Sequence, residues 1–173
     1  MTIDEFWDIV DRVHLASGGD MHTKCELLRV ELEKLSPEQV FSFQDHFEDC
    51  GIKAFTYELW GATCIIAGGY CDDDDLSDFT GTLISMGRQT FEQVISMPES
   101  LVDLPFANGK IFYEGYQYIA NMVYEGMTGA RIDIDKDSPL FYEMDWEIEG
   151  LPELFPRLFE KFKHRWLQDL GRF

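Results

Sequence analysis

The stretch from Leu59 to Arg88, LWGATCIIAGGYCDDDDLSDFTGTLISMGR, decides the fold. It begins with nine uncharged residues, Leu59 to Ala67, and then passes through a double glycine and four consecutive aspartates. From Phe79 onward, apolar residues recur again at helical spacing. The pattern predicts a buried helix, a tight acidic turn and a second helix that packs back on the first.

Start signals predict further helices before this stretch. Thr2 and Glu5 have the spacing of a capping box, and an apolar face follows them. A second apolar stripe starts at Met21, and a third helix starts at Ser36-Pro37, where a cap residue precedes a proline. The buried helix of the central stretch is then the fourth, over residues 52–67, and its apolar surface on all sides is typical of the middle of a bundle.

Three more helices are expected after the acidic turn. The fifth covers residues 76–96, the sixth carries an apolar strip from Phe112 to Val123, and Pro152 and Pro156 introduce the last. The chain has no internal repeat and no strong strand alternation. Residues 1–173 are therefore predicted to form a single all-α domain, a bundle of about seven helices.

One long connection interrupts this pattern. Residues 130–150 contain seven acids and no helical stripe, which predicts a long acidic loop. Short extended pairing around Arg131 to Asp135 is the alternative for its first part. Loops of this length inside a domain often carry function.

The net charge of −19 is the strongest compositional feature of the chain. Only the last eighteen residues, 156–173, have more bases than acids. Such a field repels nucleic acid and anionic membrane, because phosphate contacts need Lys and Arg, and it attracts a basic protein or a cation. The plainer interpretation, that the acidity only maintains solubility, is left open.

Composition also bears on the compartment. No apolar run approaches the roughly 20 residues that span a bilayer, and the first residues lack the basic start and apolar block of a signal peptide. The four cysteines show no CxxC pairing and are predicted to be reduced, buried thiols. A cytoplasmic location is expected by default.

Two groups of aspartates are candidate binding residues for a partner. The first is Asp72, Asp73, Asp74 and Asp75, and the second is Asp133, Asp135 and Asp137. Neither group completes a calcium loop, because the twelfth positions are Leu83 and Met144 where a glutamate is needed. For the first group the alternatives are a helix start favoured by the helix dipole, an acidic surface for a partner, and a metal site. For the second group the alternative is a solvated loop. No metal site is predicted.

Trp60 and Arg88 are the candidate pocket residues. Trp60 either fills a gap beside Gly61 at a close helix contact or forms the floor of a pocket. Arg88 is the one base in residues 72–108, where it either forms an internal salt bridge, to Glu58 or an aspartate of the turn, or anchors a ligand.

Catalytic motifs are missing from the sequence. It has no GxSxG, Walker-type or GxGxxG pattern, and its four histidines show no HExxH spacing. No catalytic residue and no cofactor are therefore predicted.

The central block resembles the bacterial family called domain of unknown function 4240. The residues that carry the resemblance are Trp60-Gly61-Ala62, Gly68-Gly69, the aspartate run, Phe79, Leu83-Ile84 and Gly87-Arg88, together with the opening EFWDIVDR, Ser36-Pro37-Glu38 and Pro98-Glu99-Ser100-Leu101. The likeness covers most of the first 105 residues, and the C-terminal third is looser. It implies a soluble bacterial protein and brings no activity or catalytic residues with it.

Two main hypotheses about function follow. The first is a non-catalytic acidic protein-binding domain, in its sharper form an immunity or antitoxin protein that masks a basic toxin. The second is an enzyme or small-ligand sensor with a pocket between the central helices around Trp60 and Arg88. A cation-binding module is the third.

Overall fold

The structure is a computed structural model that describes residues 1–105, 111–134, 136 and 148–169, with side chains as far as residue 166. The described residues form nine α-helices and three short 3₁₀-helices, and none of them lies in a strand. In chain order the elements are α1 (Ile3–Ala16), α2 (Met21–Leu32), α3 (Pro37–Ala54), α4 (Tyr57–Ala67), α5 (Asp73–Ile84), α6 (Arg88–Ser96), η1 (Pro98–Asp103), η2 (Tyr116–Tyr118), α7 (Ile119–Thr128), η3 (Ile148–Gly150), α8 (Leu151–Leu154) and α9 (Pro156–Asp169). The all-α prediction is confirmed.

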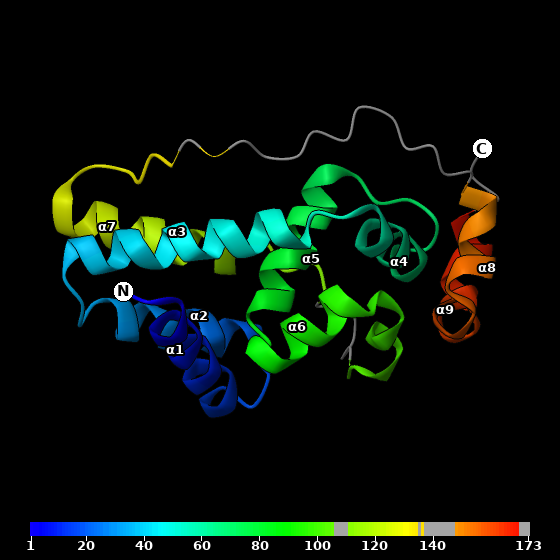
Figure 1. The fold of residues 1–173 in the computed structure, drawn as a ribbon, viewed down its shortest axis with the longest axis horizontal. Helices are drawn as coiled ribbons and strands as arrows, with labels where there is room; N and C mark the ends of the chain where they lie inside the picture. Colours follow the sequence, from blue (N-terminus) through cyan, green and yellow to red (C-terminus); the bar gives the residue numbers. More distant parts are fainter. Residues whose placement is uncertain (106–110, 135, 137–147, 170–173) are drawn as a thin grey trace.

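The helices pack as a row of pairs along the long axis of the molecule. Figure 1 shows the α1–α2 hairpin and the α3–α7 pair at one end, α5 and α6 in the middle, and α4 with α8 and α9 at the other end. The long helix α3 runs from the first pair to the middle and contacts α5. One continuous hydrophobic core joins all these layers.

Helix α4 is the most deeply buried element, as its uncharged sequence predicts. The eight consecutive residues Leu59–Ile66 are all buried. The helix begins at Thr56, whose hydroxyl accepts the amide of Leu59 at 3.2 Å, and ends at Gly68, whose φ of 103° is in the left-handed region that favours glycine. Its main neighbour is α9, whereas α5 packs mainly on α3 and only touches α4. The predicted packing of α5 back on α4 is therefore present only as a minor contact.

The predicted fifth helix, over residues 76–96, is wrong in its extent. The chain forms two helices, α5 and α6, because the backbone turns at Gly87 with a φ of 93°. This conformation is strained for any residue with a Cβ, and a Cβ at Gly87 would also meet the Asp11 carboxylate at 2.5 Å. The apolar periodicity continues across the break, since Leu83 and Phe91 are both buried, so the sequence pattern does not reveal it.

Two other predicted elements also differ from the structure. The helix expected from Phe112 begins only at Ile119, after the short η2, although Tyr116 is fully buried. The last helix is divided at Phe155 into α8 and α9, so the structure has nine α-helices rather than seven among the described residues. No extended pairing is formed at residues 131–134, and the other residues predicted to form the acidic loop, 135 and 137–147, lie outside the described residues.

Candidate functional site

The aspartate run forms the start of α5. Asp72 is the N-cap: its Oδ1 accepts the amide of Asp75 at 2.9 Å, and Oδ2 of Asp75 accepts the amide of Asp72 at 3.4 Å. This reciprocal pair satisfies backbone donors that a helix start otherwise leaves unpaired. Asp73 and Asp74 are exposed in the first turn, where the helix dipole favours negative charge. Half of the run is therefore structural, and the other half faces solvent.

Asp78 extends the acidic surface one turn further along α5. Burial raises the pKa of its carboxyl, and the negative charges of Glu114, Asp75 and Asp74 raise that pKa further, while a hydrogen bond from Gln117 lowers it. The Gln117 Nε2 donates to Oδ1 of Asp78 at 3.1 Å. We name Asp74, Asp75, Asp78 and Glu114 the acidic group. Like charges this close destabilise one another unless a cation lies nearby.

A cleft of about 310 Å³ lies beside the acidic group, between α3, α5 and the segment formed by η2 and α7. Its polar lining consists of Gln44, Glu48, Ser77, Thr80, Gln117 and Asn121. Its apolar walls include Phe47 and Phe55, and Tyr118 lies at its edge with about half of its surface exposed. Among the described residues, no lysine or arginine lines the cleft, and Glu48 is the one charged residue in its lining.

Hydrogen bonds hold the polar lining in place. The Nε2 of Gln44 donates to Oε1 of Glu48 at 2.6 Å, and Oδ1 of Asn121 accepts the amide of Ile132 at 3.2 Å. Gln44 is almost fully buried, with 3% of its surface exposed. The buried hydroxyl of Thr80 has no hydrogen-bond partner among the described residues. The cleft wall therefore has unused hydrogen-bonding capacity.

Gly81 sets the width of the cleft on the α5 side. A Cβ built on Gly81 would lie 3.0 Å from Oε1 of Gln117 and 3.8 Å from Cζ of Phe47. The bare backbone at Gly81 thus lets the Gln117 amide lie flat against α5. This contact places the carbonyl oxygen of Gln117 along the cleft wall.

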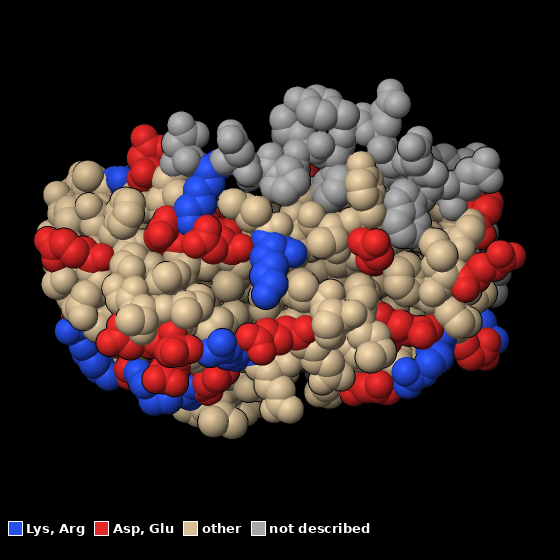
Figure 2. Space-filling view, in the orientation of Figure 1, with Lys and Arg blue, Asp and Glu red and all other residues tan. Residues whose placement is uncertain are grey.

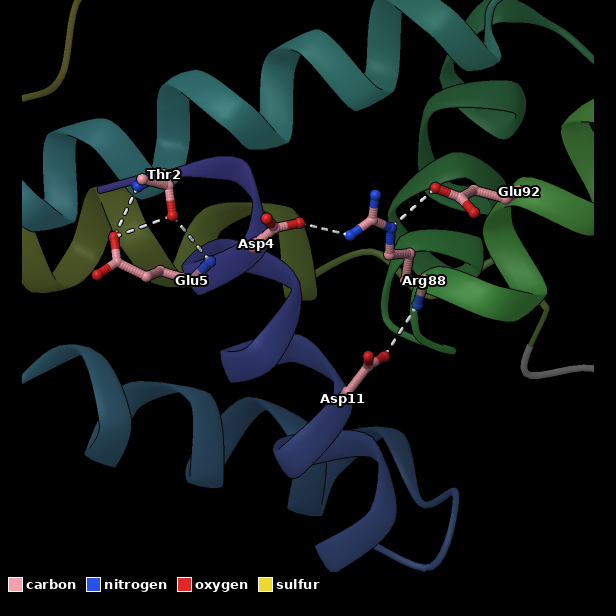
Figure 3. A network of polar contacts seen from close by, with 6 residues as sticks. All are labelled: Thr2, Asp4, Glu5, Asp11, Arg88 and Glu92. Carbon is pink, nitrogen blue, oxygen red and sulfur yellow. Dashed lines mark hydrogen bonds and ion pairs between the residues drawn. The ribbon is translucent and has the colours of Figure 1, made fainter.

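The two predicted pocket residues have different surroundings. The indole of Trp60 donates to the Cys71 carbonyl at 2.7 Å, which ties α4 to the start of α5. Arg88 turns toward α1, where its guanidinium pairs with Asp4 at 2.7 Å and with Glu92 of its own helix at 2.9 Å (Figure 3). These hydrogen bonds, to Glu92 first and then to Asp4, raise the pKa of Arg88.

The expected internal salt bridge of Arg88 is thus present, but the predicted partners are wrong. Glu58 and the aspartates of the turn are not involved, and the sequence could not indicate Asp4, which lies 84 positions away along the chain. The side chain of Arg88 is 41% exposed beside a shallow, open groove lined also by Asp11 and Gln93.

The second group of aspartates lies mostly beyond the described chain. Asp133 is exposed, whereas Asp135 and Asp137 lie outside the described residues. Between them, the ammonium of Lys136 pairs with Asp45 at 2.8 Å and Asp49 at 2.6 Å on α3. The acidic face of α3 therefore already accommodates one lysine of the same chain.

The four cysteines are free and buried, which confirms the prediction from their spacing. The thiol of Cys71 donates to the Asp72 carbonyl at 3.6 Å, and the neighbouring thiol of Cys64 together with burial raises the pKa of Cys71. Burial also raises the pKa of Cys50, to about 12. High thiol pKa values and burial disfavour the reactive thiolate.

Sequence reasoning missed Lys24, which is buried between α2 and α5. Only 2% of its surface is exposed, and its ammonium donates to Oγ of Ser85 at 3.0 Å. Burial lowers the pKa of Lys24 to about 8, and Lys24 in turn helps to lower the pKa of the nearby His14. The sequence could have indicated this burial, because Lys24 lies on the same helical stripe as Met21, Leu28 and Leu32.

The cleft was also missed, because its lining comes from segments far apart in the sequence. Gln44 gave the one local signal, since it lies on the buried face of α3 next to Phe43 and Phe47. Among the residues described, no three His, Cys, Asp or Glu side chains converge as metal ligands. No described helix has both the length and the apolar character needed to cross a bilayer.

Comparison with known proteins gives one match. The family described as "Protein of unknown function (DUF4240)" matches residues 1–126, a range that includes the acidic group and every residue that lines the cleft. No curated protein and no solved structure matches the chain significantly. The match covers well over half of the sequence, and the chain therefore belongs to the DUF4240 family.

Proposed function

We propose that this protein is a non-catalytic acidic domain that binds a basic protein. In its sharper form the proposal is an immunity or antitoxin protein that masks a basic toxin surface. The observation that carries it is the acidic group, in which burial and then the negative charges of Glu114, Asp75 and Asp74 raise the pKa of Asp78. A cationic surface placed against this group would relieve the mutual repulsion of these acids, which favours binding.

The few bases of the chain do not compensate for its acids. Arg88 is paired with Asp4 and Glu92, Arg157 with Asp103, and Lys136 with Asp45 and Asp49. Figure 2 shows acidic side chains across the whole width of one face, with fewer basic ones between them. The excess negative charge is thus left to face solvent, where it can steer a cationic partner.

The contact of Lys136 supports the proposal in a second way. Its ammonium reaches two carboxylates of α3, and its side chain is only 23% exposed. An intramolecular lysine therefore already makes the kind of contact that a basic partner would make with neighbouring acids.

A charge-matched pair of variants tests the proposal. The test variant is D73N/D74N/E114Q, which removes three exposed acids at and beside the acidic group and keeps the Asp72–Asp75 cap intact. The control is D8N/E33Q/E153Q, which removes three exposed acids elsewhere. Calorimetric titration with a decalysine peptide at low and moderate salt should show a several-fold larger loss of affinity for the test variant. Equal losses in both variants would mean that only net charge matters and would overturn the proposal.

Gene neighbourhood tests the sharper form. A toxin gene immediately upstream, whose product becomes harmless on co-expression with this chain, supports an immunity role. The D73N/D74N/E114Q variant should then protect less well than the control triple variant. Protection that is equal in both would place the toxin-binding surface elsewhere and remove the acidic group from the proposal.

The alternative function, an enzyme or small-ligand sensor, is favoured by one specific observation. This observation is the cleft beside α5, with its volume of about 310 Å³, rather than the surroundings of Trp60 or Arg88. A pocket of this size is at the lower end of the range for small-ligand sites. Thermal-shift screening of cleft variants against small metabolites would test this alternative.

A further inference from the structure

We propose that the cleft between α3, α5 and α7 binds a guanidinium group. The proposal concerns a different set of residues from the acidic group and does not depend on the identity of any basic protein. Its foundation is the chemistry of the described lining, which has one carboxylate, three side-chain amides, two aliphatic hydroxyls and aromatic walls, with no basic side chain.

The charge of the cleft selects a cation. Glu48 lines it directly, and Asp78 lies immediately behind Gln117, whose Nε2 it accepts at 3.1 Å. No arginine or lysine in the described part of the chain lines the cleft to neutralise these carboxylates. An anionic ligand would meet only negative charge, whereas a cation gains from both carboxylates.

The orientation of the amides selects a ligand with many hydrogen-bond donors. A carboxylate can only accept, so the amide NH₂ groups of Gln44 and Gln117 must face Glu48 and Asp78. The carbonyl oxygen of Gln117 then lies against the backbone at Gly81, and the acceptors that face the cleft are the carboxylate of Glu48 and the Thr80 hydroxyl, which has no partner among the described residues. The cleft therefore has an excess of acceptors, and a guanidinium, with five N–H donors and no acceptor, complements it.

The aromatic walls distinguish a guanidinium from an ammonium. Phe47 and Tyr118 line the cleft, and about half of the surface of Tyr118 is exposed. A guanidinium is planar and weakly hydrated, so it stacks on rings and loses little hydration on entry, whereas an ammonium is strongly hydrated and compact. The cleft volume of about 310 Å³ is sufficient for such a group with an aliphatic stem.

The guanidinium can belong to a free small molecule or to an arginine side chain of a partner. Agmatine represents the first source, and the capped peptide acetyl-Gly-Arg-Gly-amide represents the second. Two probes serve as controls: the same peptide with citrulline, which has a neutral urea in place of the guanidinium, and 1,4-diaminobutane, which has the charge of agmatine but an ammonium in place of the guanidinium. Binding is followed by the NMR amide shifts of cleft residues.

The expected result is that agmatine and the arginine peptide shift the amide signals of Gly81 and Asn121, whereas the citrulline peptide does not. Tighter binding of the peptide assigns the cleft to a partner side chain, and tighter binding of agmatine assigns it to a small molecule. Binding of the citrulline peptide as tight as that of the arginine peptide, or of 1,4-diaminobutane as tight as that of agmatine, would overturn the assignment to a guanidinium.

Two variants connect the binding to the cleft. E48Q removes the lining charge but keeps an acceptor, and it should weaken agmatine or peptide binding about tenfold, as expected for loss of one charge-assisted contact. G81A keeps every charge but pushes the Gln117 amide, which lies 3.0 Å from the new Cβ, so it should also weaken binding. E33Q, an exposed site outside the cleft, should leave affinity within about twofold.

Melting curves of each variant separate lost binding from lost folding. If E48Q and E33Q weaken binding equally, the cation is held by net charge alone and the proposal fails. The D73N/D74N/E114Q variant contains no cleft residue, so failure of the cleft leaves the basic-partner proposal standing, and the reverse also holds.

Discussion

Asp11 of α1 caps α6, a helix that begins 77 residues later in the chain. Its Oδ1 accepts the backbone amide of Arg88 at 2.9 Å (Figure 3). Gly87, which occupies the N-cap position, has no side chain to do so. A residue of α1 therefore caps α6. The side chain of Arg88 makes a second contact with α1, through its ion pair with Asp4.

Removing this cap should destabilise the protein modestly. Asp11→Ala should cost about 1 kcal/mol in the free energy of unfolding, because the first amide of α6 loses its acceptor. Asp11→Asn keeps a carbonyl oxygen and should cost less. The exposed Asp8 of the same helix is the control, and Asp8→Ala should change stability little. Urea denaturation gives the values, and equal effects at both positions would contradict the capping role.

Gly87 should tolerate no side chain. Gly87→Ala forces a residue with a Cβ into a φ of 93° and brings that Cβ to 2.5 Å from the Asp11 carboxylate, so a loss of about 2 kcal/mol is expected. Gly126→Ala is the control: this helical position has open space around it, and alanine should stabilise α7 by up to about 1 kcal/mol. In the Asp11→Ala background Gly87→Ala should cost less stability, because the close approach to the Asp11 carboxylate is gone and only the backbone strain remains.

Lys24 should make stability depend on pH in the alkaline range. Its pKa falls from 10.5 to about 8 on folding, because burial disfavours the charged form. Below pH 8 the lysine is protonated in both states, and the folded state bears the full cost of burying the charge. As the pH rises from 8 to 10.5 the folded protein loses this proton first, so the cost disappears and stability rises.

Lys24→Met should therefore stabilise the protein at pH 7, by at most about 3 kcal/mol from the size of the pKa difference. The advantage over the wild type should shrink as the pH approaches 10.5. Lys53→Met, at an exposed position of α3, should show neither effect. Urea denaturation at pH 7 and pH 10 provides the measurement. If Lys24→Met is more stable than the wild type by the same amount at both pH values, better packing and not the loss of a buried charge is the cause.

The cysteines should be unreactive until the protein unfolds. Burial raises the pKa values of Cys25, Cys50 and Cys71, so little thiolate is present near neutral pH. With an aromatic disulfide reagent the native protein should react very slowly, and all four thiols should appear in urea. Rapid reaction of one thiol of the native protein with the reagent would identify an accessible cysteine and refute this expectation.

The sequence was most informative where a signal is local. The capping boxes at Thr2, Ser36 and Asp72 are formed as their residue types require, because a cap involves side chains only three positions apart. The burial of Leu59–Ile66 likewise follows from an uncharged run that no exposed helix would have. These features determined the all-α class and the deep burial of α4.

Tertiary structure alone decided the remaining features. The break at Gly87 depends on a carboxylate from α1, and the pairing of Arg88 depends on Asp4, neither of which lies near them in the chain. The cleft exists because Gly81 lets Gln117 approach α5, a contact between residues 36 positions apart. In the Leu59–Arg88 stretch, the sequence by itself determined which residues are buried. Only the fold decided which distant side chains meet them, because local periodicity records the face of a helix but not its neighbour.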